Sequence, residues 1–95
     1  MKIYISGAIS GTTDFMERFA KAENELTAKG WSVVNPSKVN AQLPEDTTYE
    51  EYMKMYFCMI DMCEAIFMLQ GWSKSFGANR EFGYAMAKDM IIMHE

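Results

Sequence analysis

One segment of the sequence joins a strand, a small-residue turn and a helix in an order that few folds accommodate. The apolar run 65–69 leads into a turn rich in glycine and serine, 71–77, and a helix is predicted from about Phe76 to Lys88. A strand that is apolar at every position is typical of parallel sheets, which are covered on both faces. In such sheets the N-terminus of the following helix presents backbone N–H groups and a positive dipole end to a ligand. The segment therefore predicts an α/β fold with a site where this strand meets its helix.

Strand and helix signals alternate along the rest of the chain. Strands are predicted at 2–6, 31–34, 65–69 and 90–93, and helices at 14–29, from 48 to about 63, and at 76–88. Asp14 with Glu17, and Thr48 with Glu51, fit the capping-box pattern of a helix start. The polar segment 37–47 is predicted to be an irregular loop. Alternation of this kind predicts a flavodoxin/Rossmann-like three-layer sandwich with a four-stranded parallel sheet in the order 2-1-3-4.

Length and charge narrow the classes of function. The 95 residues form one domain, 1–95, and the net charge of −4 comes with only nine scattered lysines and arginines. We therefore expect no binding to duplex nucleic acid and none to membranes. The sequence has neither a signal peptide nor an apolar run long enough to span a bilayer, so a cytoplasmic location is expected. Cys58 and Cys63 are spaced for different helix faces and His94 is the single histidine, so we expect no disulfide, metal or cofactor.

The predicted strand order reverses its winding direction between the first and third strands. Ligands bind at such a switch point, outside the carboxyl ends of the strands. The loops 7–12 and 71–77 both leave from there, which predicts one crevice between them. In the first loop, Gly7 and Gly11 would let backbone approach a sugar or phosphate while Ser6 and Ser10 donate hydrogen bonds, although an ordinary strand-to-helix turn has the same pattern.

The second loop and its helix offer several candidate side chains. Ser75 and Gly77 begin the helix, either as an anion cradle or as a simple helix cap. Glu81 lies about one turn further on, and it is either a solvated surface residue or a carboxylate beside a ligand. We expect the helix dipole to keep Glu81 ionised, as a nucleophile requires.

Three other residues also have two interpretations. Asp61 either reaches the rim of the crevice or is an exposed charge at a helix end. Tyr4 is either a core residue or a site residue. Trp72 either stacks on a base or closes the hydrophobic core.

The stretches 3–11, 63–69 and 71–85 together resemble the nucleoside 2-deoxyribosyltransferase superfamily, which includes the 2′-deoxynucleoside 5′-phosphate N-hydrolases. The resemblance is greatest to a small bacterial and phage branch of that group. It implies that Glu81 attacks C1′ of a deoxyribose while Ser75, Gly77 and the loop from Gly7 to Gly11 hold the sugar and any 5′-phosphate. Water or a second base would then resolve the glycosyl-enzyme intermediate.

The resemblance also implies a homodimer, with a nucleoside or nucleotide as its small-molecule partner. Tyr56 stands where the family usually has an aspartate, which leaves Asp61 or Tyr56 to protonate the departing base. Two alternatives remain open at this point. One is a catalytically inactive nucleotide-binding protein, such as a phage sponge for a signalling nucleotide. The other is a structural dimer without a ligand.

Overall fold

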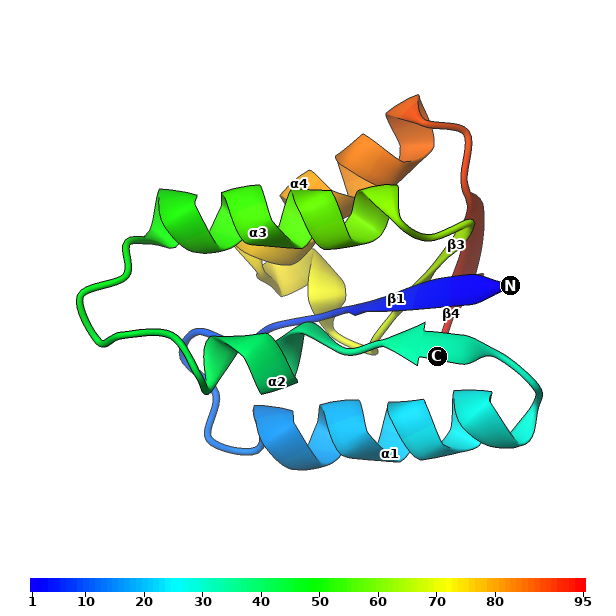
Figure 1. Cartoon of the computed structure of the whole chain (residues 1–95), viewed down its shortest axis with the longest axis horizontal. Coiled ribbons are helices and arrows are strands. Elements are labelled where there is room, and N and C mark those ends of the chain that lie inside the picture. Colours follow the sequence, from blue (N-terminus) through cyan, green and yellow to red (C-terminus); the bar gives the residue numbers. More distant parts are fainter.

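The computed structural model describes all 95 residues as alternating strands and helices (Figure 1). All of the predicted strands and helices are present, with ends that differ by at most about two residues. The elements in chain order are β1 (Lys2–Ser6), α1 (Phe15–Ala28), β2 (Ser32–Val34), α2 (Pro36–Asn40), α3 (Tyr49–Asp61), β3 (Ala65–Met68), a single 3₁₀ turn η1 (Trp72–Lys74), α4 (Phe76–Ala87) and β4 (Ile91–His94).

The four strands form one parallel sheet in the order β2-β1-β3-β4, which confirms the predicted topology. Tyr4 on β1 pairs with Val34 on one side and with Ile66 on the other, so β1 and β3 are the central strands. Helix α1 covers one face of the sheet, and α3 and α4 cover the opposite face (Figure 1). The protein is therefore a three-layer α/β sandwich of the flavodoxin/Rossmann-like type.

The alternation of side chains along β1 divides the core into two parts. Ile3 and Ile5 point to the α1 face, where they pack in a cluster with Phe19 and Leu26. Tyr4 points to the other face and packs with residues of α3 and α4. All four residues of β3 are buried, as predicted for a strand covered on both faces.

The prediction of an irregular segment at 37–47 is wrong at its start, where the chain forms the short helix α2. The Asn35 side chain caps this helix by accepting a hydrogen bond from the Ser37 backbone N–H, and Pro36 occupies the first turn, where its missing N–H costs nothing. Capping predictions for the longer helices had mixed outcomes. Thr48 and Glu51 form the predicted capping box of α3, whereas the Asp14 side chain makes no capping hydrogen bond with α1.

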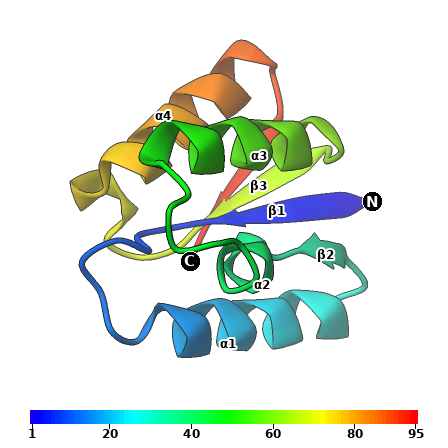
Figure 2. The same ribbon diagram turned by 60° about the vertical axis from the view of Figure 1, so that its left-hand side comes forward.

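The carboxyl ends of the strands bring several loops together at one end of the sheet. The segment that follows β1 and helix α2 lie in the left half of Figure 1, and the segment that follows β3 lies near its middle; Figure 2 turns the left-hand side forward. The Leu69 N–H donates a 2.8 Å hydrogen bond to the Ser6 carbonyl oxygen, which joins the two loops where they leave the sheet. Gly7 contacts Leu69 so closely that a Cβ atom on Gly7 would lie 2.8 Å from Leu69 Cδ1. Only glycine fits there without movement of the neighbouring chain.

Candidate functional site

A cavity of about 820 Å³ opens at this end of the sheet. Its walls come from β1 and the loop after it, from the helices α1, α2 and α3, and from η1 and the start of α4. The volume lies within the range of small-molecule sites, and half of the lining residues are hydrophobic. The cavity occupies the predicted switch point between β1 and β3.

Glu81 contributes a buried carboxylate to this cavity. Its residue surface is only 4 % exposed, although it lies on the second turn of α4. Tyr4 Oη donates a 2.6 Å hydrogen bond to Oε2, and Ser6 Oγ donates a 2.6 Å hydrogen bond to Oε1. Tyr4 and Ser6 are two positions apart on β1, so both side chains point to the face that α4 covers. One strand therefore fixes both oxygens of a carboxylate that comes from a distant helix.

The environment of Glu81 overturns the expectation that the helix dipole keeps it ionised. Burial raises the pKa of Glu81 to about 7, while the hydrogen bonds from Ser6 and Tyr4 act in the opposite direction. The effect of burial on the pKa of Glu81 is therefore larger than the opposing effect of the two hydrogen bonds. The interpretation of Glu81 as a solvated surface residue is also wrong. At neutral pH the carboxylic acid form of Glu81 is therefore much more accessible than that of an exposed glutamate.

The beginning of α4 forms a second part of the cavity wall. Ser75 Oγ accepts a 3.1 Å hydrogen bond from the Ala78 N–H, so Ser75 caps the helix, which was one of its two predicted roles. Ser75 and Gly77 both line the cavity. A Cβ on Gly77 would lie 3.5 Å from Met53 Sδ, an ordinary van der Waals distance, so packing of α4 against α3 leaves this position open to small side chains. A capped helix N-terminus thus borders the cavity beside Glu81.

Helix α3 lines the cavity with tyrosines, most of which the sequence did not single out. Tyr49, Tyr52 and Tyr56 follow a spacing of three and four residues, which places them on one face of the helix. The rings of Tyr52 and Tyr56 stack with centroids 6.0 Å apart. We call Tyr49, Tyr52 and Tyr56 the tyrosine wall. Its spacing is visible in the sequence, but which face of α3 meets the cavity depends on tertiary packing.

Asn40 and two basic residues complete the cavity, and none of them was predicted. Asn40, the last residue of α2, donates a 3.0 Å hydrogen bond from Nδ2 to Tyr56 Oη. Arg80 also lines the cavity, but its charge is paired with Glu50 at 3.0 Å. Lys74 lines the cavity and forms no ion pair. Lys74 therefore supplies the uncompensated positive charge of the site.

The structure brings together most of the predicted site residues, but not all of them. The predicted site residues that line the cavity are Tyr4, Gly7, Ser10, Tyr56, Ser75, Gly77 and Glu81. Ser6 reaches the site through its hydrogen bond to Glu81, and Gly11 lies outside the lining.

Asp61 and Trp72 are placed elsewhere. Asp61 is exposed and accepts hydrogen bonds from Tyr84 and Lys88, so it is not the acid of this cavity. Trp72 stacks on Phe82 with ring centroids 4.6 Å apart and does not line the cavity. The interpretation that Trp72 closes the hydrophobic core is therefore the one that its contacts support.

Two broader features complete the description of the molecule. It contains no cluster of three or more histidine, cysteine, aspartate or glutamate residues that would hold a metal ion. None of its helices combines the length and the apolar character required to cross a bilayer.

Sheet order, layer arrangement and cavity position define the class of protein: a Rossmann-like α/β domain with a ligand-sized site at the switch point of its sheet. Comparison with protein families gives the particular group. The family described as "Domain of unknown function (DUF4406)" matches residues 1–94, and the chain belongs to this family. A search of curated proteins found no match.

Proposed function

We propose that the protein cleaves the N-glycosidic bond of a deoxynucleoside or its 5′-monophosphate, with Glu81 as the nucleophile that attacks C1′. The observation that carries this proposal is the buried carboxylate of Glu81, which Tyr4 and Ser6 fix at 2.6 Å within a ligand-sized cavity. A carboxylate has about four lone-pair positions, so two hydrogen bonds leave others free for attack. Fixed orientation and exclusion of water are what a carboxylate nucleophile requires.

The proposed reaction has two displacements at C1′. In the first, a Glu81 oxygen forms a bond to C1′ as the C1′–N bond breaks, and the electron pair leaves with the base. In the second, water or another base attacks C1′ and the ester electron pair returns to Glu81. Because the pKa of Glu81 is about 7, the ionised nucleophile is populated at neutral pH.

The remaining cavity walls suit the parts of a nucleotide. The tyrosine wall offers flat, amphipathic rings against which a base would pack. Lys74 and the N-terminus of α4 offer a positive charge and a positive dipole end to a 5′-phosphate. The resemblance of Ser75, Gly77 and Glu81 to the deoxyribosyltransferase motif supports the same assignment.

A second candidate function is nucleotide binding without catalysis. Glu81 is the single carboxylate in the cavity lining, so no second carboxyl group stands ready to protonate a leaving base. Glycosidases generally employ two carboxyl groups for this chemistry. A cavity with one carboxylate also suits a protein that sequesters a nucleotide. A structural dimer without a ligand is the third candidate.

Release of free base tests the proposed function. The protein is incubated with deoxynucleosides and their 5′-monophosphates, and free base is followed by chromatography. We expect base release by the wild type and none by Glu81→Gln, which preserves the shape of the side chain and removes the nucleophile. Glu25→Gln, at an exposed position on α1, is the matched control and should retain full activity.

The same protein samples distinguish the alternatives. A thermal shift with nucleotide but no released base would overturn the enzymatic proposal and support a binding protein. If neither response is seen, the structural dimer remains, and sedimentation equilibrium of the wild-type chain tests it.

A further inference from the structure

The proposed reaction needs a proton for the departing base, and the hydroxyl of Tyr56 is placed to supply one. Tyr56 lines the cavity and is only 6 % exposed. Its oxygen accepts the 3.0 Å hydrogen bond from Asn40 Nδ2, and the Tyr56 hydroxyl donates no hydrogen bond to any protein group. A phenol has a single O–H proton, so the proton of Tyr56 remains available to a ligand.

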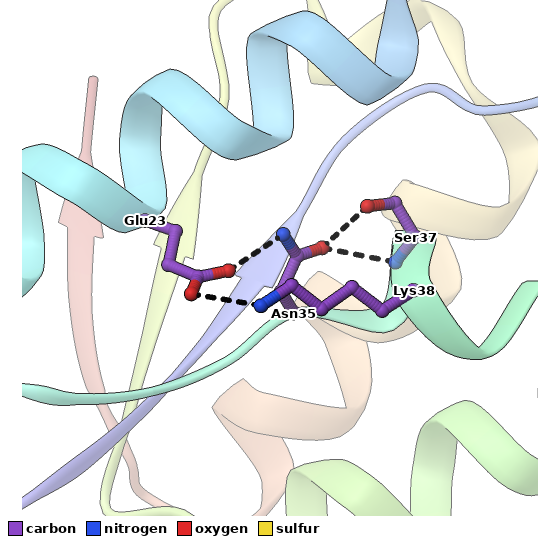
Figure 3. Close-up of polar contacts among 4 residues, drawn as sticks. All are labelled: Glu23, Asn35, Ser37 and Lys38. Carbon is purple, nitrogen blue, oxygen red and sulfur yellow. Dashed lines mark hydrogen bonds and ion pairs between the residues drawn. The ribbon is translucent and has the colours of Figure 1, made fainter.

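A partly buried polar network joins α2, which carries Asn40, to α1 (Figure 3). Asn35 Nδ2 donates to Glu23 at 3.0 Å, and Asn35 Oδ1 accepts from the backbone N–H of Ser37 at 3.0 Å and from its hydroxyl at 2.7 Å. Lys38 adds an ion pair with Glu23 at 3.0 Å. A helix as short as α2 is not stable by itself, so these contacts hold it in place. The network therefore determines where the last residue of α2, Asn40, meets α3.

We propose that Tyr56 is the acid that protonates the leaving base and that Asn40 is the positioning residue that keeps the Tyr56 O–H directed at the ligand. This inference rests on the proposed function. As the Glu81 oxygen bonds to C1′, the C1′–N electron pair moves to the base and the Tyr56 proton transfers to a base heteroatom. The resulting phenolate accepts the Asn40 N–H. In the second step water attacks C1′, its proton returns to the phenolate, and the ester electron pair returns to Glu81.

The electrostatics of the two residues are consistent with these steps. Burial raises the pKa of Tyr56, the hydrogen bond from Asn40 lowers it, and the negative charge of Glu81 raises it. Tyr56 is therefore protonated at neutral pH, as an acid must be. When Glu81 becomes a neutral ester, its repulsion of a phenolate disappears in the same step that forms the phenolate. Asn40 then stabilises that phenolate with a charge-assisted hydrogen bond.

A comparison of two substrates distinguishes the loss of a proton donor from other defects of a variant enzyme. The first is the ordinary deoxynucleoside monophosphate that the wild type cleaves fastest. The second is N7-methyl-2′-deoxyguanosine 5′-monophosphate, whose base already carries a positive charge and leaves without a proton. Release of base from each substrate is measured for the wild type, Tyr56→Phe and Glu81→Gln, with spontaneous release subtracted.

The expected results differ between the two substrates. On the ordinary substrate, kcat of Tyr56→Phe should fall about 10²-fold or more, the usual contribution of a general acid. On the methylated substrate it should stay within about twofold of the wild type, since no proton is needed there. Glu81→Gln should be inactive on both. Equal losses of Tyr56→Phe on the two substrates, or no loss on either, would overturn the assignment of Tyr56.

Asn40 is tested by a substitution of nearly identical shape. Asn40→Asp replaces the N–H donor with an acceptor that would draw the Tyr56 proton away from the ligand. We expect kcat on the ordinary substrate to fall about 10- to 100-fold, as for loss of one hydrogen bond to a charged group, with KM little changed. On the methylated substrate, kcat should again stay close to that of the wild type. Asn40→Ser, which is smaller and neutral, provides a second variant if Asn40→Asp unfolds at a lower temperature.

The outcomes for the inference and for the proposed function are distinguishable. If the wild type releases no base from either substrate, the proposed function fails and the roles of Tyr56 and Asn40 fail with it. If the wild type is active and the variants of Asn40 match it on the ordinary substrate, only the role of Asn40 is overturned.

Discussion

Tyr4 Oη lies 2.6 Å from Glu81 Oε2 and joins the first strand of the sheet to the last helix, across 77 positions of sequence. Tyr4 is fully buried, and burial together with the nearby Glu81 raises its pKa well above its ordinary value. Tyr4 therefore remains a hydrogen-bond donor to Glu81 throughout the neutral range. The relationship makes the central strand of the sheet part of the site as well as part of the core.

Removal of either donor should raise the pKa of Glu81 further above 7. The hydrogen bonds of Ser6 and Tyr4 both lower this pKa, and Ser6 has the larger effect. We therefore expect Ser6→Ala and Tyr4→Phe each to shift it upward, with the larger shift in Ser6→Ala. The measurement is a ¹³C NMR titration of the Glu81 carboxyl group. A pKa that moves toward 4.5 in either variant would contradict these roles of Ser6 and Tyr4.

Glu81 should also make folding stability fall as the pH rises. Its pKa is about 7 in the folded chain against an ordinary value of 4.5, so between these pH values the folded state binds more protons than the unfolded state. Stability then decreases from about pH 4.5 to about pH 7 and stays lower above that range. The total loss from this group is about 3 kcal/mol, at 1.36 kcal/mol for each pKa unit.

Glu81→Gln should remove this contribution to the pH profile, because its amide stays neutral and the Tyr4 and Ser6 hydroxyls can turn to meet it. The two proteins should be similarly stable at pH 4, and the variant should be the more stable at pH 8. Urea unfolding across that range is the measurement, with Glu25→Gln as an exposed control whose profile should follow the wild type. If the free energy of unfolding decreased more steeply with pH in Glu81→Gln than in the wild type, the raised pKa of Glu81 would be contradicted.

The sheet order followed from the sequence because the pattern of apolar runs is local and strong. Ala65 to Met68 is apolar at every position and is buried at every position, and right-handed crossovers leave few ways to arrange four such strands. The location of the cavity then followed from topology. The loops 7–12 and 71–77 had to meet once β1 and β3 were neighbours.

The sequence did not reveal features that depend on distant partners. Glu81 was judged by its place on a helix, whereas its burial depends on Tyr4 and Ser6, 77 and 75 positions away. Helix α2 was missed although Asn35 and Pro36 are local start signals, because it has only five residues and also depends on the contact of Asn35 with Glu23 on α1. Asn40 was missed for the same reason. Local patterns thus predicted the framework, and the polar contacts between elements had to come from the structure.

Gly7 is tightly packed and Gly83 is not, so substitution of each by alanine should change stability in opposite directions. In Gly7→Ala the new Cβ would lie 2.8 Å from Leu69 Cδ1 and 2.9 Å from Leu69 Cβ, so the junction of β1 and β3 must move. We expect a loss of about 1–3 kcal/mol in the free energy of unfolding, as for an overpacked core. At Gly83, on α4, a Cβ atom would meet no packed neighbour within 4 Å outside the backbone of its own helix. Gly83→Ala should therefore stabilise the helix by about 0.4–1 kcal/mol.

Urea unfolding of both alanine variants checks the pair. Since Gly7 lines the cavity, Gly7→Ala should also weaken any thermal shift produced by a nucleotide, whereas Gly83→Ala should preserve it. Equal stability changes in the two variants would show that the contact with Leu69 is not the reason for glycine at position 7.

The two helix starts that resemble each other in sequence should respond differently to loss of their capping residues. Thr48 Oγ1 accepts a 3.2 Å hydrogen bond from the Glu51 N–H, and Glu51 Oε1 accepts a 2.8 Å hydrogen bond from the Thr48 N–H. Asp14 has no such bond at the start of α1. Thr48→Ala should therefore lower the free energy of unfolding by about 1 kcal/mol. Asp14→Ala should change it by less than about 0.5 kcal/mol, as is usual for exposed positions.

Thr48→Ser, which retains the capping oxygen, should recover most of the stability that Thr48→Ala loses. Because α3 begins at Tyr49 and carries the tyrosine wall, fraying of its first turn should also release Tyr49 and Tyr52 from the cavity. Hydrogen exchange of the first amides of α3 measures this directly and should accelerate in Thr48→Ala alone. Equal acceleration at the start of α1 in Asp14→Ala would mean that Asp14 supports its helix by a route other than a capping hydrogen bond.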